Sequence, residues 1–245
     1  MVKRKVKRRK NIAVAGVFAV IKRRVKRWLL TLIACLLGIP VVLVLVFKFI
    51  DPPFWGWEIA RTLSPPKGYP EHSQHQWVDM SAIAKTMPLA VIASEDQRFP
   101  EHWGLDVHAL ISVLKNSGED GPNRGASTIT QQTAKNVFLF PSHSYVRKAY
   151  ELYIALLLEV IWGKQRIMEV YLNVVEFGPG IYGVEAASQH YFGVSAERIS
   201  RYQAAQLAVV LPNPYRIQPV PMTYYVRHRV SWVLRQMRNL GPVSL

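Results

Sequence analysis

The pattern of apolar positions divides the chain into one uninterrupted apolar run near the N-terminus and a longer region with helical periodicity. The run from Trp28 to Phe47 contains 20 residues and no charge. A helix of that length spans about 30 Å, the thickness of a bilayer's hydrocarbon core. Lys48 follows the run and can reach the membrane interface. The pattern therefore predicts one transmembrane helix over residues 28–48, with aromatic residues at its interfaces: Trp28, Phe54, Trp55 and Trp57.

Basic residues are concentrated before this run. Residues 1–27 contain twelve Lys and Arg and no acid, whereas residues 51–245 contain 18 Lys and Arg against 16 Asp and Glu. The positive-inside rule makes residues 1–27 a basic cytoplasmic arm and places the rest of the chain outside. Because most of the net charge of +15 resides in this arm, it does not indicate a nucleic-acid partner.

A cleaved signal peptide is the alternative to a membrane anchor. Its apolar region is normally about 7–15 residues long and ends at an Ala-x-Ala-like site. Here the run is longer and continues into Asp51-Pro52-Pro53, which favours an anchor. The only cysteine, Cys35, lies inside the run, so the exported part offers no disulfide and no cysteine pair for a metal.

The rest of the chain is predicted to be mainly α. Residues 49–76 are rich in Pro, Gly and aromatic residues and predict a membrane-proximal linker, followed by one domain over residues 77–245. Helix start and stop signals predict helices over Pro88–Glu95, Asp106–Gly118, from Ser127, over Ser144–Gly163, over Lys164–Asn173, from Ser200 (a capping box with Gln203) to Pro212, and over Thr223–Asn239 before Gly241.

The first segment with chemical potential is E-D-Q-R-F-P-E-H-W-G-L-D, which begins at Glu95. On a helix, Glu95 shares a face with the apolar residues Val91 and Ile92. A carboxylate on an apolar face is costly unless it is paired or functional, and partial burial would raise its pKa toward that of a general base. The alternative is a solvated glutamate at the end of a helix.

The second segment is G-A-S-T-I-T-Q-Q-T-A-K-N, over residues 125–136. On a helix, Thr128, Gln131, Gln132 and Lys135 fall at i, i+3, i+4 and i+7, a spacing that usually marks an apolar stripe. This polar stripe, which ends in a cation, suits sugar hydroxyls and a phosphate. The alternative is a solvated face, although such faces usually carry mixed Glu and Lys.

The third segment is R-K-A-Y-E, in which Arg147 and Lys148 lie four and three residues before Glu151. Taken alone, this spacing is typical of a surface ion pair that contributes a few tenths of a kcal/mol.

The fourth segment contains Y-L-N and the glycines Gly178, Gly180 and Gly183. These glycines match the dinucleotide pattern G-x-G-x-x-G, but that pattern requires a preceding strand. Here a helical pattern that ends at Asn173 precedes it, so a tight turn between helices is predicted instead.

In order, these four segments resemble one known family over most of residues 88–190. The matching motifs are E-D-x-x-F-x-x-H-x-G-x-D, G-x-S-T-I-T-Q-Q-x-x-K-N, R-K-x-x-E and Y-L-N-x-x-x-x-G-x-G-x-x-G. The chain resembles the peptidoglycan glycosyltransferases, whose catalytic domain also forms the first domain of bifunctional penicillin-binding proteins. Each motif is moderately specific, and the series of four is much more so.

The monofunctional biosynthetic form of the family is the most similar one. A penicillin-reactive domain needs S-x-x-K together with K-T-G. Ser112 and Lys115 fit the first pattern, but no K-T-G follows. We therefore expect a single-span protein that carries the glycosyltransferase alone.

The resemblance implies a lysozyme-like, mainly α domain, lipid II as substrate, and an inverting transfer that releases undecaprenyl pyrophosphate. The attacking sugar hydroxyl is a weak nucleophile and needs a base, which would be Glu95. The pyrophosphate leaving group needs cations rather than an acid, and Lys135, Arg147 and Lys148 could supply them. Glu151 would be the second catalytic carboxylate, orienting those cations or the donor sugar.

The matched motif positions also predict the binding surface. The residues expected to hold sugars and phosphates are Ser127, Thr128, Gln131, Gln132, Lys135, Asn136, Arg147, Lys148, Phe99 and His102. The sequence indicates no cofactor and no metal site; Asp96 and Asp106 could bind a divalent cation, but capping suits them better. The expected partners are lipid II, the growing glycan chain, the membrane, and division or cell-wall synthesis proteins. The expected location is the inner membrane, with the catalytic domain in the periplasm.

Two other classes of protein fit less well. A peptidoglycan-cleaving enzyme of lysozyme-like shape would protonate the leaving sugar oxygen with a carboxylic acid, and it would have no use for Lys135, Arg147 and Lys148. A catalytically silent membrane scaffold would not need every polar motif position, although a scaffolding role can coexist with catalysis.

Overall fold

The computed structural model describes residues 2–107, 111, 127–142 and 144–245, with side chains from residue 22 onward. It divides into a helical N-terminal unit that ends at Leu45 and a compact unit over Val46–Leu245. Most of the helix predicted between Asp106 and Gly118 lies outside the described residues, as do Ser112 and Lys115.

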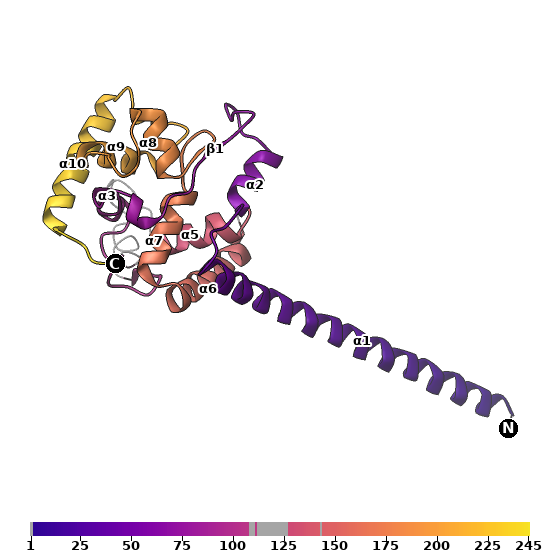
Figure 1. Cartoon of the computed structure of the whole chain (residues 1–245). Coiled ribbons are helices and arrows are strands. Elements are labelled where there is room, and N and C mark those ends of the chain that lie inside the picture. Colours follow the sequence, from indigo (N-terminus) through magenta and orange to yellow (C-terminus); the bar gives the residue numbers. More distant parts are fainter. Residues whose placement is uncertain (1, 108–110, 112–126, 143) are drawn as a thin grey trace. The chain divides into compact units, whose positions relative to one another are not determined.

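The N-terminal unit is formed by helix α1 (Val2–Phe47), drawn in indigo in Figure 1. Its part over Lys22–Phe47 is long and apolar enough to cross a membrane. Large apolar side chains such as Leu29 and Leu36 are exposed along it, as contact with lipid would require. The basic arm and the apolar run form one continuous helix, and Pro40 lies inside it without ending it.

The compact unit is mainly α, as predicted, and its few strands are short. Strands β1, β2 and β3 form a sheet in the order β1-β3-β2, with β1 parallel and β2 antiparallel to β3. The elements are α2 (Gly56–Leu63), β1 (Gln74–His75), the 3-10 helix η1 (Met80–Ala82), α3 (Thr86–Glu95), α5 (Ile129–Phe138), α6 (Tyr145–Ile161), α7 (Gly163–Val174), β2 (Glu176–Gly178), β3 (Ile181–Tyr182), α8 (Val184–Phe192), α9 (Arg201–Val210) and α10 (Tyr224–Leu240).

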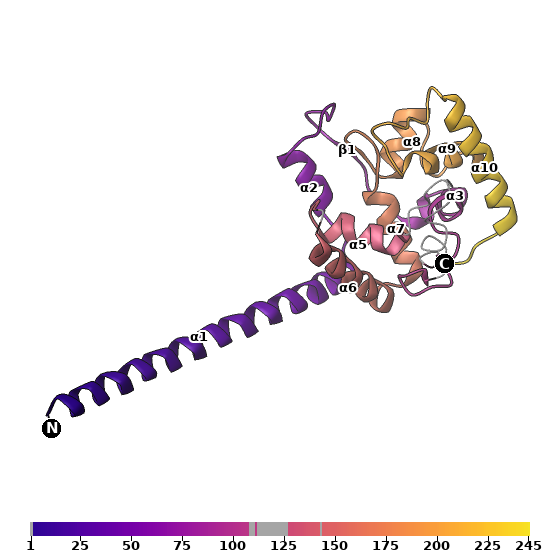
Figure 2. The ribbon, with the colours of Figure 1, turned by 180° about the vertical axis from the view of Figure 1, so that it is seen from behind.

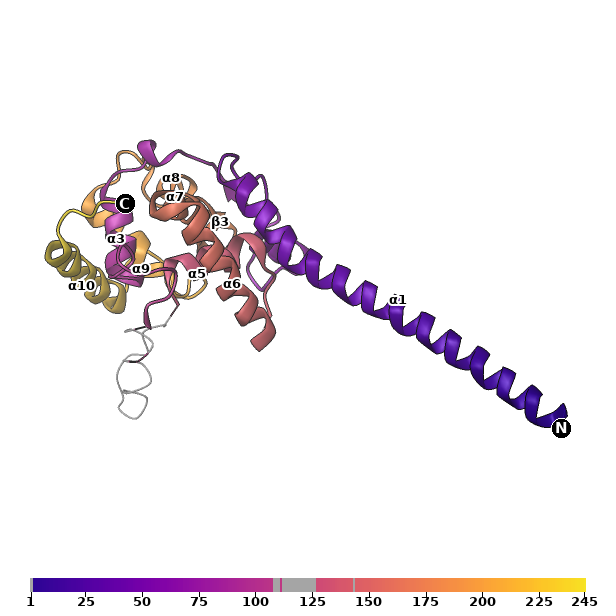
Figure 3. The ribbon, with the colours of Figure 1, turned by 90° about the horizontal axis from the view of Figure 1, so that it is seen from below.

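Two groups of helices build the core. Helices α3, α9 and α10 pack on one another, and α5 packs on both α6 and α7; Figures 1 and 2 show both groups from opposite sides. Figure 3 shows α5, α6 and α7 side by side. Helix α7 buries side chains along most of its length, including Ile167, Met168 and Tyr171. Each fully buried large apolar side chain contributes about 1.5–3 kcal/mol of transfer free energy.

Among the predicted helix starts, those at Ser144, Ser200 and Thr223 are confirmed, the cap at Ser127 is wrong, and Pro88 is the third rather than the first residue of α3, which begins at Thr86. The side chains of Ser144, Ser200 and Thr223 cap α6, α9 and α10. Helix α5 is capped by Thr128 instead of Ser127, and Thr128 forms a capping box with Gln131. The structure prefers Thr128 because its hydroxyl also donates to the carbonyl of Gly104 at 2.6 Å, which fixes the chain before the helix.

The segment over residues 49–76, predicted as a linker, contributes α2 and β1 to the compact unit. The buried Trp55 ring lies 5.5 Å from the Tyr182 ring, and Gln74 pairs with Ile181 across the sheet. At Gly56 any Cβ would come within 2.7 Å of the Leu139 carbonyl oxygen, so α2 approaches α5 closely. The interfacial position predicted for Trp55 is therefore wrong, because this ring is packed inside protein.

The glycine-rich segment forms more than a turn between helices. Strands β2 and β3 place a short hairpin between α7 and α8. Gly180 and Gly183 have φ angles of 70° and 80°, which suit glycine because it lacks a Cβ. The rejection of a dinucleotide-binding turn is consistent with this hairpin, because helix α7 and not a long strand leads into it.

Candidate active site

Glu95 is the last residue of α3, and it is partly exposed. Its carboxylate accepts a hydrogen bond from Gln132 Nε2 at 3.1 Å and one from Ser94 Oγ at 3.4 Å. Burial raises the pKa of Glu95, while these two hydrogen bonds and the positive charge of Arg229 oppose that shift. A carboxylate with a raised pKa beside an accessible surface can act as a general base.

The start of α5 is tied to the end of α3 by Asp96. One carboxylate oxygen of Asp96 accepts from the backbone N–H of Ile129 at 3.0 Å. The other lies 2.9 Å from His102 Nε2. Because Asp96 follows Glu95 directly, this bond fixes the register between the two helices. It thereby sets Gln132, one turn into α5, against Glu95.

A cluster of two cations surrounds Glu151 on α6. Arg147 Nη1 lies 2.8 Å from one carboxylate oxygen, and Lys148 Nζ lies 2.5 Å from the other. The ion pair expected from the spacing is present, but the Glu151 side chain is only 3% exposed. A buried carboxylate needs such partners. The pair therefore differs from a solvated surface pair, and it leaves Arg147 and Lys148 partly exposed around a fixed anion.

Lys135 lies on α5 one turn beyond Gln132. Burial lowers the pKa of its ammonium; Arg147 and Lys148 lower it further, while Glu151 and Glu95 raise it. The ammonium lies 4.8 Å from the centre of the Trp57 ring on α2, a cation–π distance. The structure thus brings Lys135 into the electrostatic neighbourhood of both predicted carboxylates.

Other predicted site residues are buried. The side chains of Phe99, His102, Thr128, Gln131 and Asn136 are at most 9% exposed. Phe99 lies under the Lys164 ammonium, His102 contacts Asp96, and Thr128 and Gln131 form the cap of α5. Burial argues against direct substrate contact for Phe99 and His102. Ser127 is exposed just before α5.

Three residues near the site were not identified from the sequence. Tyr171 donates to Gln132 Oε1 at 3.1 Å, Trp57 stacks near Lys135, and Arg229 on α10 acts on the charge of Glu95. Tyr171 is the first residue of the Y-L-N motif, but no residue near it in the sequence indicates a contact with the site. Trp57 and Arg229 lie far away in sequence, in segments where aromatic and basic residues are common.

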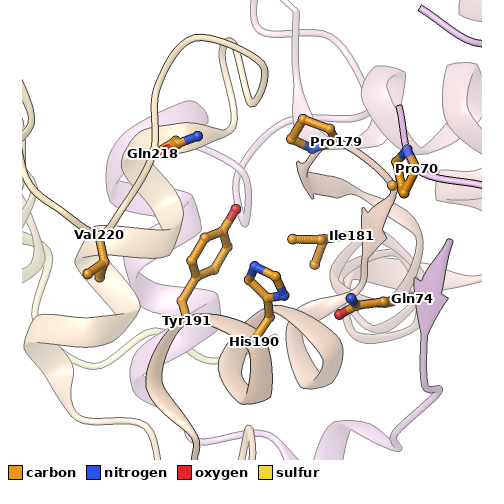
Figure 4. Close-up of a pocket in the computed structure, with 9 residues that line it drawn as sticks. Pro70, Gln74, Pro179, Ile181, His190, Tyr191, Gln218 and Val220 are labelled. Carbon is orange, nitrogen blue, oxygen red and sulfur yellow. The ribbon is translucent and has the colours of Figure 1, made fainter. Parts of the chain in front are cut away.

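A separate hollow of about 490 Å³ lies beside the β2–β3 hairpin and α8. Figure 4 shows Tyr191 and His190 on one side of it and Pro179 and Pro70 on the other. None of the predicted site residues lines it. The candidate active site is therefore distinct from this hollow.

The part of the chain that the structure describes contains no group of three or more His, Cys, Asp and Glu side chains placed to hold a metal ion. Asp96 uses both oxygens in hydrogen bonds, and Asp106 lies 3.5 Å from Arg98. The sequence expectation of no cofactor and no resident metal stays a prediction.

Comparison with known proteins gives one consistent result. The sequence profile of the family described as "Transglycosylase" matches residues 62–238. A Vibrio parahaemolyticus protein named biosynthetic peptidoglycan transglycosylase is 61% identical over 223 residues, which cover 91% of this chain and 99% of that protein. Proteins of the same name are 48% identical in Shewanella oneidensis, covering 91% of this chain and 95% of the relative, and 46% identical in Cronobacter sakazakii, covering 89% and 91%.

Proposed function

Since this chain belongs to the transglycosylase family and is a monofunctional peptidoglycan glycosyltransferase of cell-wall synthesis, we propose that it polymerises lipid II with Glu95 as its base. The observation that carries the proposal is the arrangement along α5. Gln132 contacts Glu95, and Lys135, one turn on, is coupled to the cluster of Arg147, Lys148 and Glu151. One helix thus joins a candidate base to a candidate pyrophosphate site.

In the proposed reaction, Glu95 takes the proton of the 4-hydroxyl of an incoming lipid II sugar. The oxygen forms a bond to the anomeric carbon of the growing chain from the face opposite the leaving group. The carbon–oxygen bond to undecaprenyl pyrophosphate breaks, and its electron pair leaves with the pyrophosphate. The configuration at the anomeric carbon therefore inverts. General-base assistance of this kind contributes about 10²–10⁴-fold in rate.

The leaving group calls for positive charge rather than a proton. Lys135, Arg147 and Lys148 could stabilise the developing charge on the pyrophosphate. Both oxygens of Glu151 accept hydrogen bonds from cations, Arg147 and Lys148. We therefore assign Glu151 the role of orienting Arg147 and Lys148 rather than that of a proton donor. Ser127 and Gln132 are the other partly or fully exposed residues suited to hold sugar or phosphate groups.

We also propose a single-pass inner-membrane protein with the basic arm in the cytoplasm and the compact unit in the periplasm. The apolar helix and the twelve basic residues before it support this orientation. Because lipid II is held in a membrane, an anchored enzyme meets it at a higher effective concentration. No cofactor is needed for the proposed chemistry.

The proposal is tested by incubating the purified full-length protein with labelled lipid II in detergent. We expect a polymer that lysozyme digests, with one undecaprenyl pyrophosphate released for each sugar pair added. Preformed glycan strands offered in parallel should stay intact. Failure to form polymer, or cleavage of the preformed strands, would show that the reaction has been assigned wrongly.

A further inference from the structure

We infer that Tyr171 is a positioning residue for Glu95, because its hydroxyl fixes which end of the Gln132 amide faces the carboxylate. The inference rests on the proposed function, since it takes Glu95 as the base. It assigns a task to a residue on α7, in the interior of the compact unit, that does not itself contact the reacting atoms.

The contact runs through three helices. Tyr171 on α7 is fully buried. Its hydroxyl donates to Gln132 Oε1 on α5 at 3.1 Å, and Gln132 Nε2 donates to Glu95 Oε2 at the end of α3 at 3.1 Å. Each of the two bonds uses a different end of the same amide. A change at Tyr171 is therefore transmitted to Glu95 through one rotatable group.

The amide of glutamine can be turned by 180° with almost no change in shape, but its two ends have opposite hydrogen-bonding character. With the NH₂ end toward Glu95, the amide stabilises the ionised carboxylate, which is the form a base needs. With the oxygen end toward Glu95, it would accept a hydrogen bond from the neutral carboxylic acid and stabilise that form. The orientation of Gln132 therefore decides in which direction it moves the pKa of Glu95.

Tyr171 selects the first orientation because it acts as a donor. If the amide turned, its NH₂ end would face the tyrosine hydroxyl, and the hydroxyl hydrogen would lose the acceptor that it has among the described residues. A buried donor without a partner is costly. Burial, together with the carboxylates of Glu95 and Asp96, raises the pKa of Tyr171, so the hydroxyl keeps its hydrogen over the working pH range.

The other charged groups around Glu95 do not depend on this amide. Asp96 raises the pKa of Glu95, and Arg229 from α10 lowers it. Lys135 from α5 is electrostatically coupled to Glu95. Tyr171 from α7 is neutral, because its pKa is raised, and so adds no charge of its own. All of these charges are retained when the tyrosine hydroxyl alone is removed. A shift in the titration of Glu95 after that change would therefore report on the amide.

The test is the pH dependence of kcat for polymerisation of lipid II by the full-length protein and by Tyr171→Phe. Without the hydroxyl, the Gln132 amide no longer prefers the orientation with its NH₂ end toward Glu95. The ionised form of Glu95 then loses part of its stabilisation. We expect the acidic limb of the profile to move to higher pH by about half to one unit, with the rate at the high-pH plateau kept within about three-fold. Gln132→Met should give at least the same shift, and the double variant should shift no further than Gln132→Met alone.

A second variant strengthens the same donor with only a small increase in the size of the side chain. Site-specific replacement of Tyr171 by 3-fluorotyrosine makes the phenol more acidic. The hydrogen bond to Gln132 Oε1 should then strengthen, and through the amide so should the bond to Glu95. The acidic limb should move to lower pH, the opposite direction from Tyr171→Phe.

Tyr191→Phe is the matched control, because Tyr191 also donates its hydroxyl to an acceptor inside the protein, the carbonyl of Phe177. It should leave the acidic limb in place. An unshifted profile for Tyr171→Phe, a uniform fall in rate at every pH, or an equal shift in Tyr191→Phe would overturn the inference. Glu95→Gln distinguishes failure of the inference from failure of the proposed function. If Glu95→Gln is inactive, Glu95 keeps its role as the base and only the role of Tyr171 is rejected. If Glu95→Gln is active, the proposed function fails and the inference fails with it.

Discussion

At the residue scale, Glu95 is held between two opposing effects. Burial favours its neutral form, and the bonds from Gln132 and Ser94 favour its ionised form. Because burial is the larger effect, the pKa of Glu95 lies above its ordinary value. A general base with this environment works best above its own pKa, so the polymerisation rate should rise with pH through an acidic limb that lies above the usual range of a glutamate.

The same shift predicts a stability effect. A carboxyl whose pKa is higher in the folded than in the unfolded state stabilises the fold below its unfolded pKa, and that contribution is lost as pH rises through its folded pKa. At neutral pH the ionised Glu95 therefore costs stability. We expect Glu95→Gln to melt at an equal or higher temperature than the wild type at pH 7, with the gain shrinking at pH 4. Scanning calorimetry at both pH values measures this, and a clearly lower melting temperature at pH 7 would contradict the burial argument.

Lys135 provides a prediction about the leaving group. Replacing it by Met keeps most of the side-chain volume and removes the cation. We expect a phosphate-containing donor or phosphoglycolipid inhibitor to bind about 10–100-fold more weakly, as for the loss of one charged hydrogen bond. Fluorescence titration measures the affinity. Lys67→Met, at an exposed lysine on the segment before β1, is the control; equal affinities in all three proteins would reject a phosphate contact.

Whether a site residue could be predicted from the sequence depended on how far along the chain its contacting residues lie. Glu95 was recognisable because its own helix and motif place it on an apolar face. The ion pairs of Arg147 and Lys148 with Glu151 were predictable because one helical turn joins these residues, but their place in the site was indicated only by the family resemblance. Tyr171 acts through Gln132 at a separation of 39 residues, and no local pattern reports such a contact.

At the element scale, the start of α5 is the feature on which the site geometry depends. The cap joins Thr128 and Gln131 in a capping box and adds the bond to Gly104. Loss of an N-cap side chain costs about 0.5–2 kcal/mol. Thr128→Ala should therefore lower the free energy of unfolding by about that amount, measured as a shift of the urea midpoint.

Ser127→Ala is the matched comparison, because Ser127 is exposed and precedes the cap. It should leave the urea midpoint within about 0.5 kcal/mol of the wild type, as surface substitutions do. If Ser127→Ala destabilised the protein and Thr128→Ala did not, the assignment of the cap would be reversed.

Helices were more predictable than the segments that pair over long distances. Ser144, Ser200 and Thr223 were found as caps because capping is a local property. The parts of residues 49–76 that fold could not be found in this way. The buried Trp55 ring lies against the rings of His75 and Tyr182, and β1 exists only through its pairing with β3. A short strand of two residues has no periodicity of its own to detect.

At the scale of the whole molecule, the chain consists of a helical unit up to Leu45 and a compact unit from Val46. The second holds all the candidate site residues and has its own buried core. A protein that begins at Val46 should therefore fold, with an unfolding transition close to that of the compact unit in the full-length protein. It should also polymerise lipid II in detergent micelles at a similar rate.

The same truncation should be much less active on lipid II held in liposomes, because it has lost the anchor that raises the effective substrate concentration. We expect a fall of about 10²-fold relative to the full-length protein in the same liposomes. Rates are compared at equal protein and lipid II concentrations. Equal rates for both proteins in liposomes would show that the apolar helix does not serve substrate capture.

The central claim is that Glu95 is the base of a lipid II polymerase, and the initial rate of glycan formation from labelled lipid II tests it most directly. The measurement compares full-length wild type, Glu95→Gln and Glu101→Gln, the last at an exposed glutamate in the same segment that pairs only with Arg98 among the described residues. We expect Glu95→Gln to lose about 10²–10⁴-fold in rate while its unfolding transition remains intact, and Glu101→Gln to stay close to the wild type. Polymer formation by Glu95→Gln at nearly the wild-type rate would contradict the account.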